Sequence, residues 1–107
     1  MKTLLAKQLA DWLRDSTAAQ PQLLDVREPW ELERCRLDNV ISIPLGQLPT
    51  RFNELDPERP LVCICHHGMR SMNAAAWLER NGFADIYNLT GGVAAWASDV
   101  DPAFPKY

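Results

Sequence analysis

Short apolar runs alternate along the chain with stretches of helical periodicity, and this alternation restricts the fold more than any other feature. Turn residues flank the apolar runs, which is typical of buried strands. The predicted strands cover residues 22–26, 40–43, 61–64 and 86–89. The predicted helices cover residues 7–15, 29–34, 47–55, 71–81 and 93–97. Buried strands separated by helices predict an α/β fold, with a parallel sheet covered on both faces.

The length and composition fit one domain with its own hydrophobic core. The chain has 107 residues, of which 47% are hydrophobic and 23% are charged. A chain of this size can bury a core without disulfide bonds. We expect residues 1–107 to form a single domain, and the proline-rich residues 99–107 to lie on its surface as an extended tail.

Charge and cysteine content argue against several classes of function. The net charge is −3 with both signs interspersed, which does not fit a nucleic-acid-binding surface. No stretch has membrane-spanning length, and the first residues lack the pattern of a signal peptide. Three cysteines cannot all be paired, so we expect a cytoplasmic protein with reduced thiols. The sequence does not indicate an oligomeric state.

The segment with the clearest chemical character follows the apolar run 61–64. In parallel α/β sheets, ligands bind beyond the carboxyl ends of the strands. Cys65 lies at such an end and shortly before a predicted helix, where free N–H groups and the helix dipole favour an anion. A setting of this kind favours the thiolate, which is the reactive form of cysteine.

The residues after Cys65 strengthen this interpretation. Gly68 allows the loop to curl so that successive N–H groups point inward, and Arg70 adds a permanent positive charge. These features predict a nucleophilic cysteine that can become a more extended anion, such as a persulfide. The alternative is a buried structural cysteine beside an ordinary loop.

Several motifs resemble those of the rhodanese family of sulfurtransferases. The loop 65–71, with Cys-x-x-Gly-x-Arg-Ser, resembles the active-site loop of that family. In residues 35–40 the chain departs from the family's usual Gly-His-Ile-Pro-Gly-Ala, so the turn there is expected to differ. The other similar segments follow in order over nearly the whole chain: Leu24-Asp25-Val26-Arg27-Glu28 with Trp30-Glu31, Ile41-Ser42-Ile43-Pro44-Leu45, Trp77-Leu78 with Gly82-Phe83, and Leu89-Thr90-Gly91-Gly92 with Val93-Ala94-Ala95-Trp96.

This resemblance implies a rhodanese-like fold, with a central parallel sheet of about five strands and helices on both faces. It also implies a thiosulfate:cyanide type of activity, in which Cys65 takes a sulfane sulfur from a donor and passes it to an acceptor. The donor and acceptor are expected to be small molecules or proteins, and no cofactor or metal is expected. The expected persulfide-binding loop consists of His66, His67, Gly68, Met69, Arg70 and Ser71.

Charged residues near the end of the run 22–26 are expected to support the loop. Asp25 is expected either to pair with Arg70 or a loop N–H, or to cap the helix that begins at Pro29. Arg27 and Glu31 are four residues apart and are expected to form an ion pair.

The adjacent histidines raise the question of a metal site with Cys63 and Cys65. Zinc sites need a second pair of ligands, and the chain has no histidine besides His66 and His67. We therefore expect these histidines to line the mouth of the site or to face solvent. Cys63 is expected to lie in the core, and Cys35 to be exposed, either incidentally or as a resolving thiol.

Two other functions are compatible with the loop. A persulfide relay module would carry sulfur only for a protein partner. A phosphatase or arsenate reductase would hold an oxyanion above Cys65. Four residues separate Cys65 from Arg70, whereas phosphatases that cradle phosphate above a cysteine use five. The shorter loop favours a terminal sulfur atom over a tetrahedral phosphate.

Overall fold

The structure, a computed structural model that describes residues 1–107, contains one sheet of five parallel strands. The strand order is β1-β5-β4-β2-β3, and every neighbouring pair is parallel. This confirms the α/β fold with a central parallel sheet that the sequence predicts. The strands are β1 (Lys2–Leu4), β2 (Gln22–Asp25), β3 (Ile41–Ser42), β4 (Leu61–Ile64) and β5 (Ile86–Leu89).

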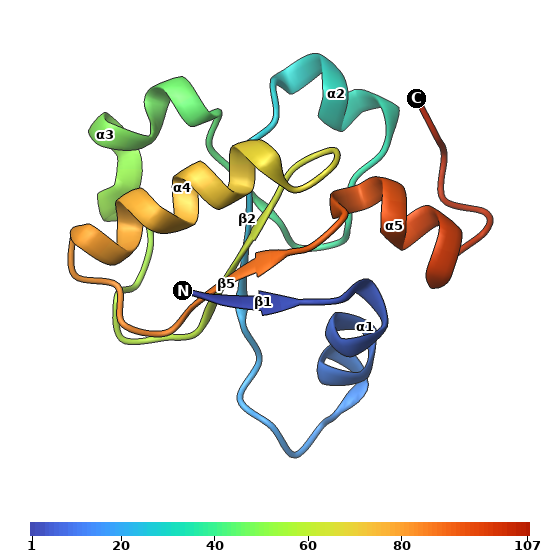
Figure 1. The fold of residues 1–107 in the computed structure, drawn as a ribbon, viewed down its shortest axis with the longest axis horizontal. Helices are drawn as coiled ribbons and strands as arrows, with labels where there is room; N and C mark the ends of the chain where they lie inside the picture. Colours follow the sequence, from blue (N-terminus) through green and yellow to red (C-terminus); the bar gives the residue numbers. More distant parts are fainter.

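Helices cover both faces of this sheet (Figure 1). Helices α1 (Ala6–Arg14) and α5 (Gly92–Asp99) cover one face, and α3 (Leu48–Arg51) and α4 (Met69–Arg80) cover the other. The short helix α2 (Pro29–Arg34) follows the carboxyl end of β2. None of the helices has the length and apolar character needed to cross a membrane.

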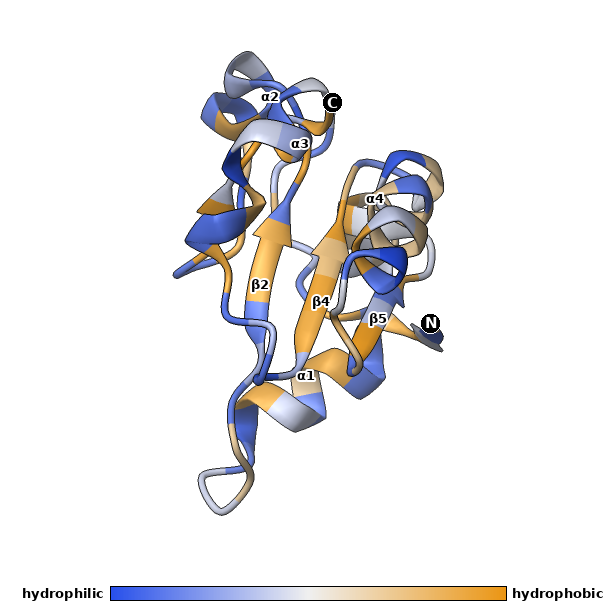
Figure 2. Ribbon diagram, turned by 90° about the vertical axis from the view of Figure 1, so that its left-hand side faces the viewer, coloured by the Kyte–Doolittle hydropathy of each residue, from blue (hydrophilic) through white to orange (hydrophobic).

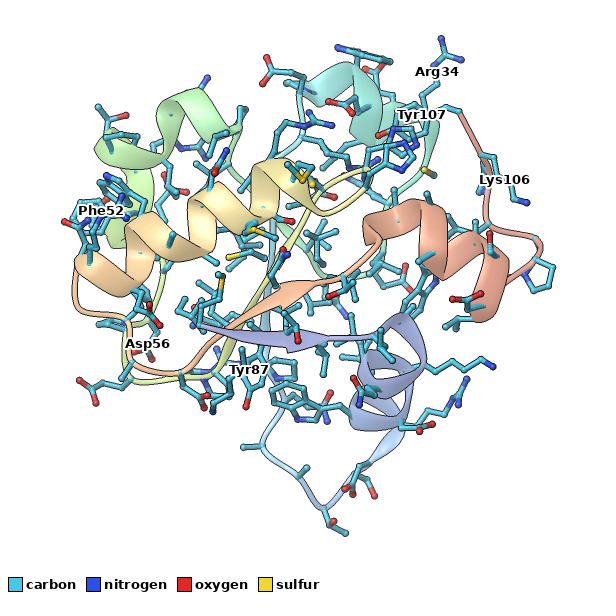
Figure 3. The ribbon with its side chains drawn as sticks, viewed as in Figure 1. Arg34, Phe52, Asp56, Tyr87, Lys106 and Tyr107 are labelled. Carbon is cyan, nitrogen blue, oxygen red and sulfur yellow. The ribbon has the colours of Figure 1, made fainter.

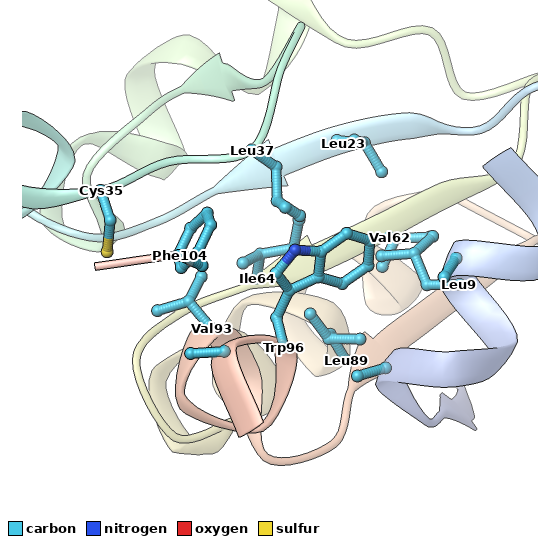
Figure 4. Packing of buried hydrophobic residues seen from close by; sticks show 13 residues of the cluster. Leu9, Leu23, Cys35, Leu37, Val62, Ile64, Leu89, Val93, Trp96 and Phe104 are labelled. Carbon is cyan, nitrogen blue, oxygen red and sulfur yellow. The ribbon is translucent and has the colours of Figure 1, made fainter. Parts of the chain in front are cut away.

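The two cores follow from the alternation of side chains along the strands. In β4, Val62 and Ile64 point into the core beneath α1 and α5, whereas Leu61 and Cys63 point into the core beneath α3 and α4. Both sets are buried, so the central strand β4 is apolar along its whole length (Figure 2). Trp96 of α5 lies in the first core against residues of β2, β4 and β5 (Figure 4).

Two elements differ from the sequence predictions. The edge strand β1 was not expected, because it is three residues long and only partly buried, which leaves no apolar run to detect. The predicted helix 47–55 is divided into the 3-10 turn Leu45–Gln47, the four-residue helix α3 and the 3-10 turn Phe52–Glu54. Pro49 lies in the first turn of α3 and has no N–H to donate, which favours short helical pieces here.

The first turn of α5 lies against the segment that follows β4. The N–H groups of Val93 and Ala94 donate to the carbonyl oxygens of Cys65 and His66, at 3.0 and 3.1 Å. Gly92 immediately precedes the two donors and has a φ of +59°, and a Cβ atom there would clash with the carbonyl oxygens of Cys65 and His66. Only glycine permits this contact between the two backbones.

We predict that Gly92→Ala destabilises the fold and displaces the segment at Cys65. The new methyl group meets backbone atoms rather than a flexible side chain, so we expect a loss of at least about 2 kcal/mol in the free energy of unfolding. Urea denaturation measures this loss. Gly46→Ala is the control, since no atom lies within 4 Å of a Cβ atom there; it should change stability by less than about 0.5 kcal/mol. Equal effects of the two substitutions would contradict the prediction.

Candidate active site

Cys65 lies between β4 and α4, at the carboxyl edge of the sheet, and only 1% of its surface is exposed. Its Sγ atom accepts hydrogen bonds from the backbone N–H groups of Gly68, at 3.1 Å, and Ser71, at 3.4 Å. Gly68 has a φ of 102°, which turns the backbone so that α4 begins at Met69. The loop therefore directs two donors at the sulfur, and such an arrangement suits a sulfur that carries negative charge.

A buried polar group on β5 joins this loop. The hydroxyl of Ser71 lies 3.3 Å from Cys65 Sγ and donates to Asn88 Oδ1 at 2.5 Å. Asn88 Nδ2 in turn donates to the carbonyl oxygen of Gly68 at 3.1 Å. Sequence reasoning missed Asn88, although an amide within an otherwise apolar strand was a usable signal, because buried polar groups need partners.

Arg70 binds Glu31 of α2 instead of lying free beside the sulfur. Its two terminal nitrogens donate to the two Glu31 carboxylate oxygens at 2.6 and 2.9 Å. Hydrogen bonding by Arg70 is the main reason that the pKa of Glu31 falls to about 2, and burial of the carboxylate opposes this change. The expected positive charge is therefore present beside the loop, but a carboxylate neutralises most of it.

Asp25 and Arg27 form a pair of their own, which corrects three expectations. The Asp25 carboxylate accepts bonds from Arg27 Nε at 3.0 Å and Nη2 at 2.8 Å, and from the Arg27 backbone N–H at 3.0 Å. Asp25 therefore neither pairs with Arg70 nor caps α2. Arg27 does not pair with the Glu31 carboxylate either. Both Asp25 and Arg27 are fully buried, and a buried carboxylate is stable only with a full set of donors, which its neighbour Arg27 supplies.

The C-terminal segment 101–107 is mostly exposed, but two of its side chains pack against the rest of the molecule. Phe104 is buried in the core beneath α1 and α5. The Tyr107 hydroxyl donates to Glu31 Oε2 at 2.7 Å and accepts from Arg27 Nη1 at 3.0 Å. Burial is the main reason that the pKa of Tyr107 is raised. Figure 3 shows this side chain beside α2. Tyr107 is thus a second residue of the site that the motifs did not indicate.

The two histidines stack upon one another above the loop. Their ring centroids are 4.0 Å apart, and the other side of His66 stacks on Tyr107, also at 4.0 Å. His67 is exposed and His66 is partly buried. Burial, followed by the neighbouring His67, lowers the pKa of His66, so this ring is neutral at pH 7. A cavity of about 180 Å³ opens beside the histidines and Tyr107.

The other two cysteines lie in the interior. Cys63 is fully buried, as expected, and burial raises its pKa to about 12. Cys35 was expected to be exposed but is buried, with its sulfur 3.8 Å from Arg27 Nη1. All three cysteines are free thiols, and no three histidine, cysteine or carboxylate side chains are grouped so that they could hold a metal ion.

Apolar side chains are exposed near the loop, and a larger hollow lies elsewhere on the surface. Met69 is exposed, and together with the exposed Trp30 of α2 it presents apolar surface to solvent. A larger hollow of about 530 Å³ is lined in part by Leu13, Leu37 and Phe104. No residue of the loop 65–71 lines this hollow. The candidate site is therefore identified by the hydrogen bonds to the Cys65 sulfur and not by the size of a cavity.

Comparison with known proteins gives a consistent result. A family model described as "Rhodanese-like domain" matches residues 5–99. A thiosulfate sulfurtransferase, GlpE, from Shewanella oneidensis is 35% identical over a region that covers 74% of this chain and 78% of that protein. A putative sulfur carrier protein, YrkF, from Bacillus subtilis is 37% identical over 74% of this chain and 43% of its own length.

Two further similarities concern domain context and fold. The chloroplastic rhodanese-like/PpiC domain-containing protein 12 of Arabidopsis thaliana is 41% identical over 82% of this chain, but the match spans only 31% of that protein. The crystal structure of a rhodanese-like domain protein from Staphylococcus aureus superimposes with a TM-score of 0.84 and 27% identity. That match covers 100% of this chain and 99% of the other.

We predict that the Glu31–Arg70 pair makes stability depend on pH. The pKa of Glu31 is lower in the folded state than its ordinary value of 4.5. The charged carboxylate therefore stabilises the folded protein at any pH above 4.5. That contribution is lost as the pH falls through about 2. Arg70 is 38% exposed, so screening by water reduces the expected effect, and Glu31→Gln should cost about 1–2 kcal/mol at neutral pH.

Urea denaturation at several pH values measures the difference between Glu31→Gln and the unmodified protein. The difference should shrink as the pH falls below 4.5 and should vanish near the folded-state pKa of about 2. Glu54→Gln is the matched control, because it removes a carboxylate from the exposed pair with Arg51 and should change little. A deficit that stays constant over the whole pH range would show that Glu31 acts through its shape and not its charge.

Proposed function

This chain belongs to the rhodanese-like family, whose members include sulfurtransferases, and we propose that it transfers a sulfane sulfur through a persulfide on Cys65. The observation that carries the proposal is the pair of backbone N–H groups, from Gly68 and Ser71, that converge on Sγ. They hold the sulfur in place before attack and remain in the loop to receive the new anion after it.

The proposed reaction has two half-reactions, with thiosulfate and cyanide as the simplest donor and acceptor. The Cys65 thiolate attacks the outer sulfur of thiosulfate, a new S–S bond forms, and sulfite leaves with the electron pair of the old S–S bond. Cyanide then attacks the outer sulfur of the persulfide and forms a C–S bond. The S–S bond breaks, thiocyanate leaves, and the electron pair returns to Cys65 as the thiolate.

The loop residues have different parts in this proposal. Gly68 and Ser71 supply the N–H donors, and the left-handed backbone of Gly68 makes the curl possible. Arg70 and Glu31 join the loop to α2 and fix its outer side. His66, His67 and Met69 form the outer surface of the loop, where a donor or acceptor would approach.

A protein-bound persulfide as the natural donor is favoured by one feature of the charges. Glu31 neutralises most of the Arg70 charge, and His66 is neutral, so little net positive charge remains to attract the thiosulfate dianion. A relay module of this kind would form the Cys65 persulfide with thiosulfate but would turn over slowly.

The rate of loading tests this preference. A small persulfide donor without net negative charge should load Cys65 faster than thiosulfate does. If thiosulfate is the natural donor, thiosulfate should load Cys65 faster than the small persulfide donor.

We predict that Cys65 alone carries the transferable sulfur. After incubation with thiosulfate, intact-protein mass spectrometry should show a gain of one sulfur atom, and Cys65→Ser should lose both this gain and the transfer to cyanide. The matched controls are Cys35→Ala and Cys63→Ala, since both thiols are buried away from the loop donors. Loss of the sulfur gain in a folded control variant, with Cys65→Ser still loaded, would refute the assignment.

We predict that the protein transfers sulfur and does not hydrolyse phosphate esters. Four residues separate Cys65 from Arg70, and two loop N–H groups already close on Sγ itself. A bound phosphate would also need the Arg70 guanidinium, which Glu31 holds through both terminal nitrogens. Thiocyanate formation should be measurable, while release from an aryl phosphate should stay at the background rate. Cys65-dependent hydrolysis that exceeds sulfur transfer would overturn this prediction.

A further inference from the structure

Asn88 is a buried polar residue that contacts the loop but not the sulfur of Cys65. It lies on β5, is only 2% exposed, and pairs in the sheet with Cys63 of β4. Its side chain makes one hydrogen bond to Ser71 and one to Gly68, and these are the same two residues whose N–H groups hold Cys65 Sγ. A buried amide that binds both of the residues whose N–H groups hold the sulfur suggests a function beyond packing.

The directions of these bonds follow from simple chemistry. The carbonyl oxygen of Gly68 can only accept, so the amide nitrogen of Asn88 must face it. Asn88 Oδ1 then faces Ser71 and can only accept, so the single hydroxyl proton of Ser71 is donated to Asn88. Toward Cys65 Sγ, which lies 3.3 Å away, the Ser71 oxygen can therefore offer only a lone pair.

We propose that Asn88 is a positioning residue for sulfur transfer, which withholds the Ser71 hydroxyl proton from Cys65 Sγ. This inference rests on the proposed function of Cys65. In the thiol form, the S–H group can donate to the Ser71 oxygen. In the thiolate form, the sulfur faces a lone pair, and its hydrogen-bond donors are the backbone N–H groups of Gly68 and Ser71. Asn88 thus keeps the thiolate less stabilised and more nucleophilic than a free Ser71 hydroxyl would allow.

The same arrangement favours the loaded state over the empty thiolate. In the persulfide, the negative charge lies on the outer sulfur and Sγ is neutral, so the lone pair of Ser71 no longer opposes a charge. Attack by Cys65 on a donor therefore relieves the unfavourable contact. Without Asn88, the hydroxyl would turn toward Sγ, stabilise the thiolate and reduce the driving force for loading.

Other charged or titratable groups around Cys65 stay the same in the variants below. Arg70 belongs to α4 and is bound by Glu31 of α2, and Cys63 belongs to β4. His66 and His67 follow Cys65 in the loop, and at the end of β2 the Asp25 carboxylate is neutralised by Arg27. A change in the titration of Cys65 between variants therefore reports the hydroxyl of Ser71.

The first test is the thiolate-to-thiol ratio of Cys65, measured by ultraviolet absorbance over a range of pH without any sulfur donor. In Asn88→Leu the new side chain is similar in size to asparagine. The variant does not leave the Gly68 carbonyl oxygen without a hydrogen bond, because this oxygen still accepts from the Met72 N–H at 3.2 Å. The freed Ser71 hydroxyl can then donate to Sγ. At a fixed pH below the midpoint of the Cys65 titration, the ratio of thiolate to thiol should rise about fivefold, which is the effect of one net hydrogen bond.

The double variant tests whether Asn88 acts through Ser71. In a Ser71→Ala background, Asn88→Leu should not change the ratio further, because the hydroxyl is already absent. Ser71→Ala alone also tests the direction of the bond. If the hydroxyl offers a lone pair to Sγ, its removal raises the thiolate ratio, and if it donates a proton there, its removal lowers the ratio. This sign is decisive even if Asn88→Leu does not fold.

The second measurement separates this inference from the proposed function. Folded Asn88→Leu should load sulfur from thiosulfate more slowly per thiolate, by about the same factor of five, with an unchanged requirement for Cys65. An unchanged or lowered thiolate ratio in Asn88→Leu, or a lowered ratio in Ser71→Ala, would overturn the role of Asn88. Absence of any sulfur transfer with the expected titration would instead refute the proposed function and leave the hydrogen-bond direction established.

Discussion

The contact between the first turn of α5 and the backbone of Cys65 and His66 is the constraint on which the site depends. Two N–H groups of α5 bind the two carbonyl oxygens, and Gly92 allows the backbones to meet without a side chain between them. This contact fixes the start of the loop, whereas Gly68, Ser71 and Asn88 fix its other end. The sulfur of Cys65 is held between two anchored ends, and its surroundings need little rearrangement during a reaction.

The charged residues of the site are arranged as two ion pairs. Asp25 binds Arg27 and Glu31 binds Arg70, while Tyr107 bridges the pairs by accepting from Arg27 and donating to Glu31. Each carboxylate is thereby neutralised by its own arginine, as burial demands. The support for an anion at Cys65 consequently comes from backbone N–H groups rather than from a free arginine charge. This balance suits a singly charged sulfur better than a phosphate dianion.

Much of the fold and the central part of the site could be predicted from the sequence. The apolar runs located β2, β4 and β5, and the position of Cys65 between a strand and a helix indicated the reactive loop. The strand β1 could not be predicted, because an edge strand of three residues needs no apolar pattern. The partners of Asp25, Glu31 and Arg70 were also predicted wrongly, since spacing along the sequence does not show which charge a neighbouring element brings.

The amino-acid pattern alone is enough to predict the α/β class, the order of most elements and a reactive loop in which glycine, arginine and serine follow Cys65. These properties depend on local periodicity and on the backbone preferences of single residues. That Asn88, Glu31 and Tyr107 belong to the site follows from the packing of the folded chain and not from the pattern. They lie on β5, α2 and the C-terminal segment, and contact between such distant segments depends on how the sheet and helices pack. Burial then forces each polar group to find a partner, and the packing alone determines which partner is within reach.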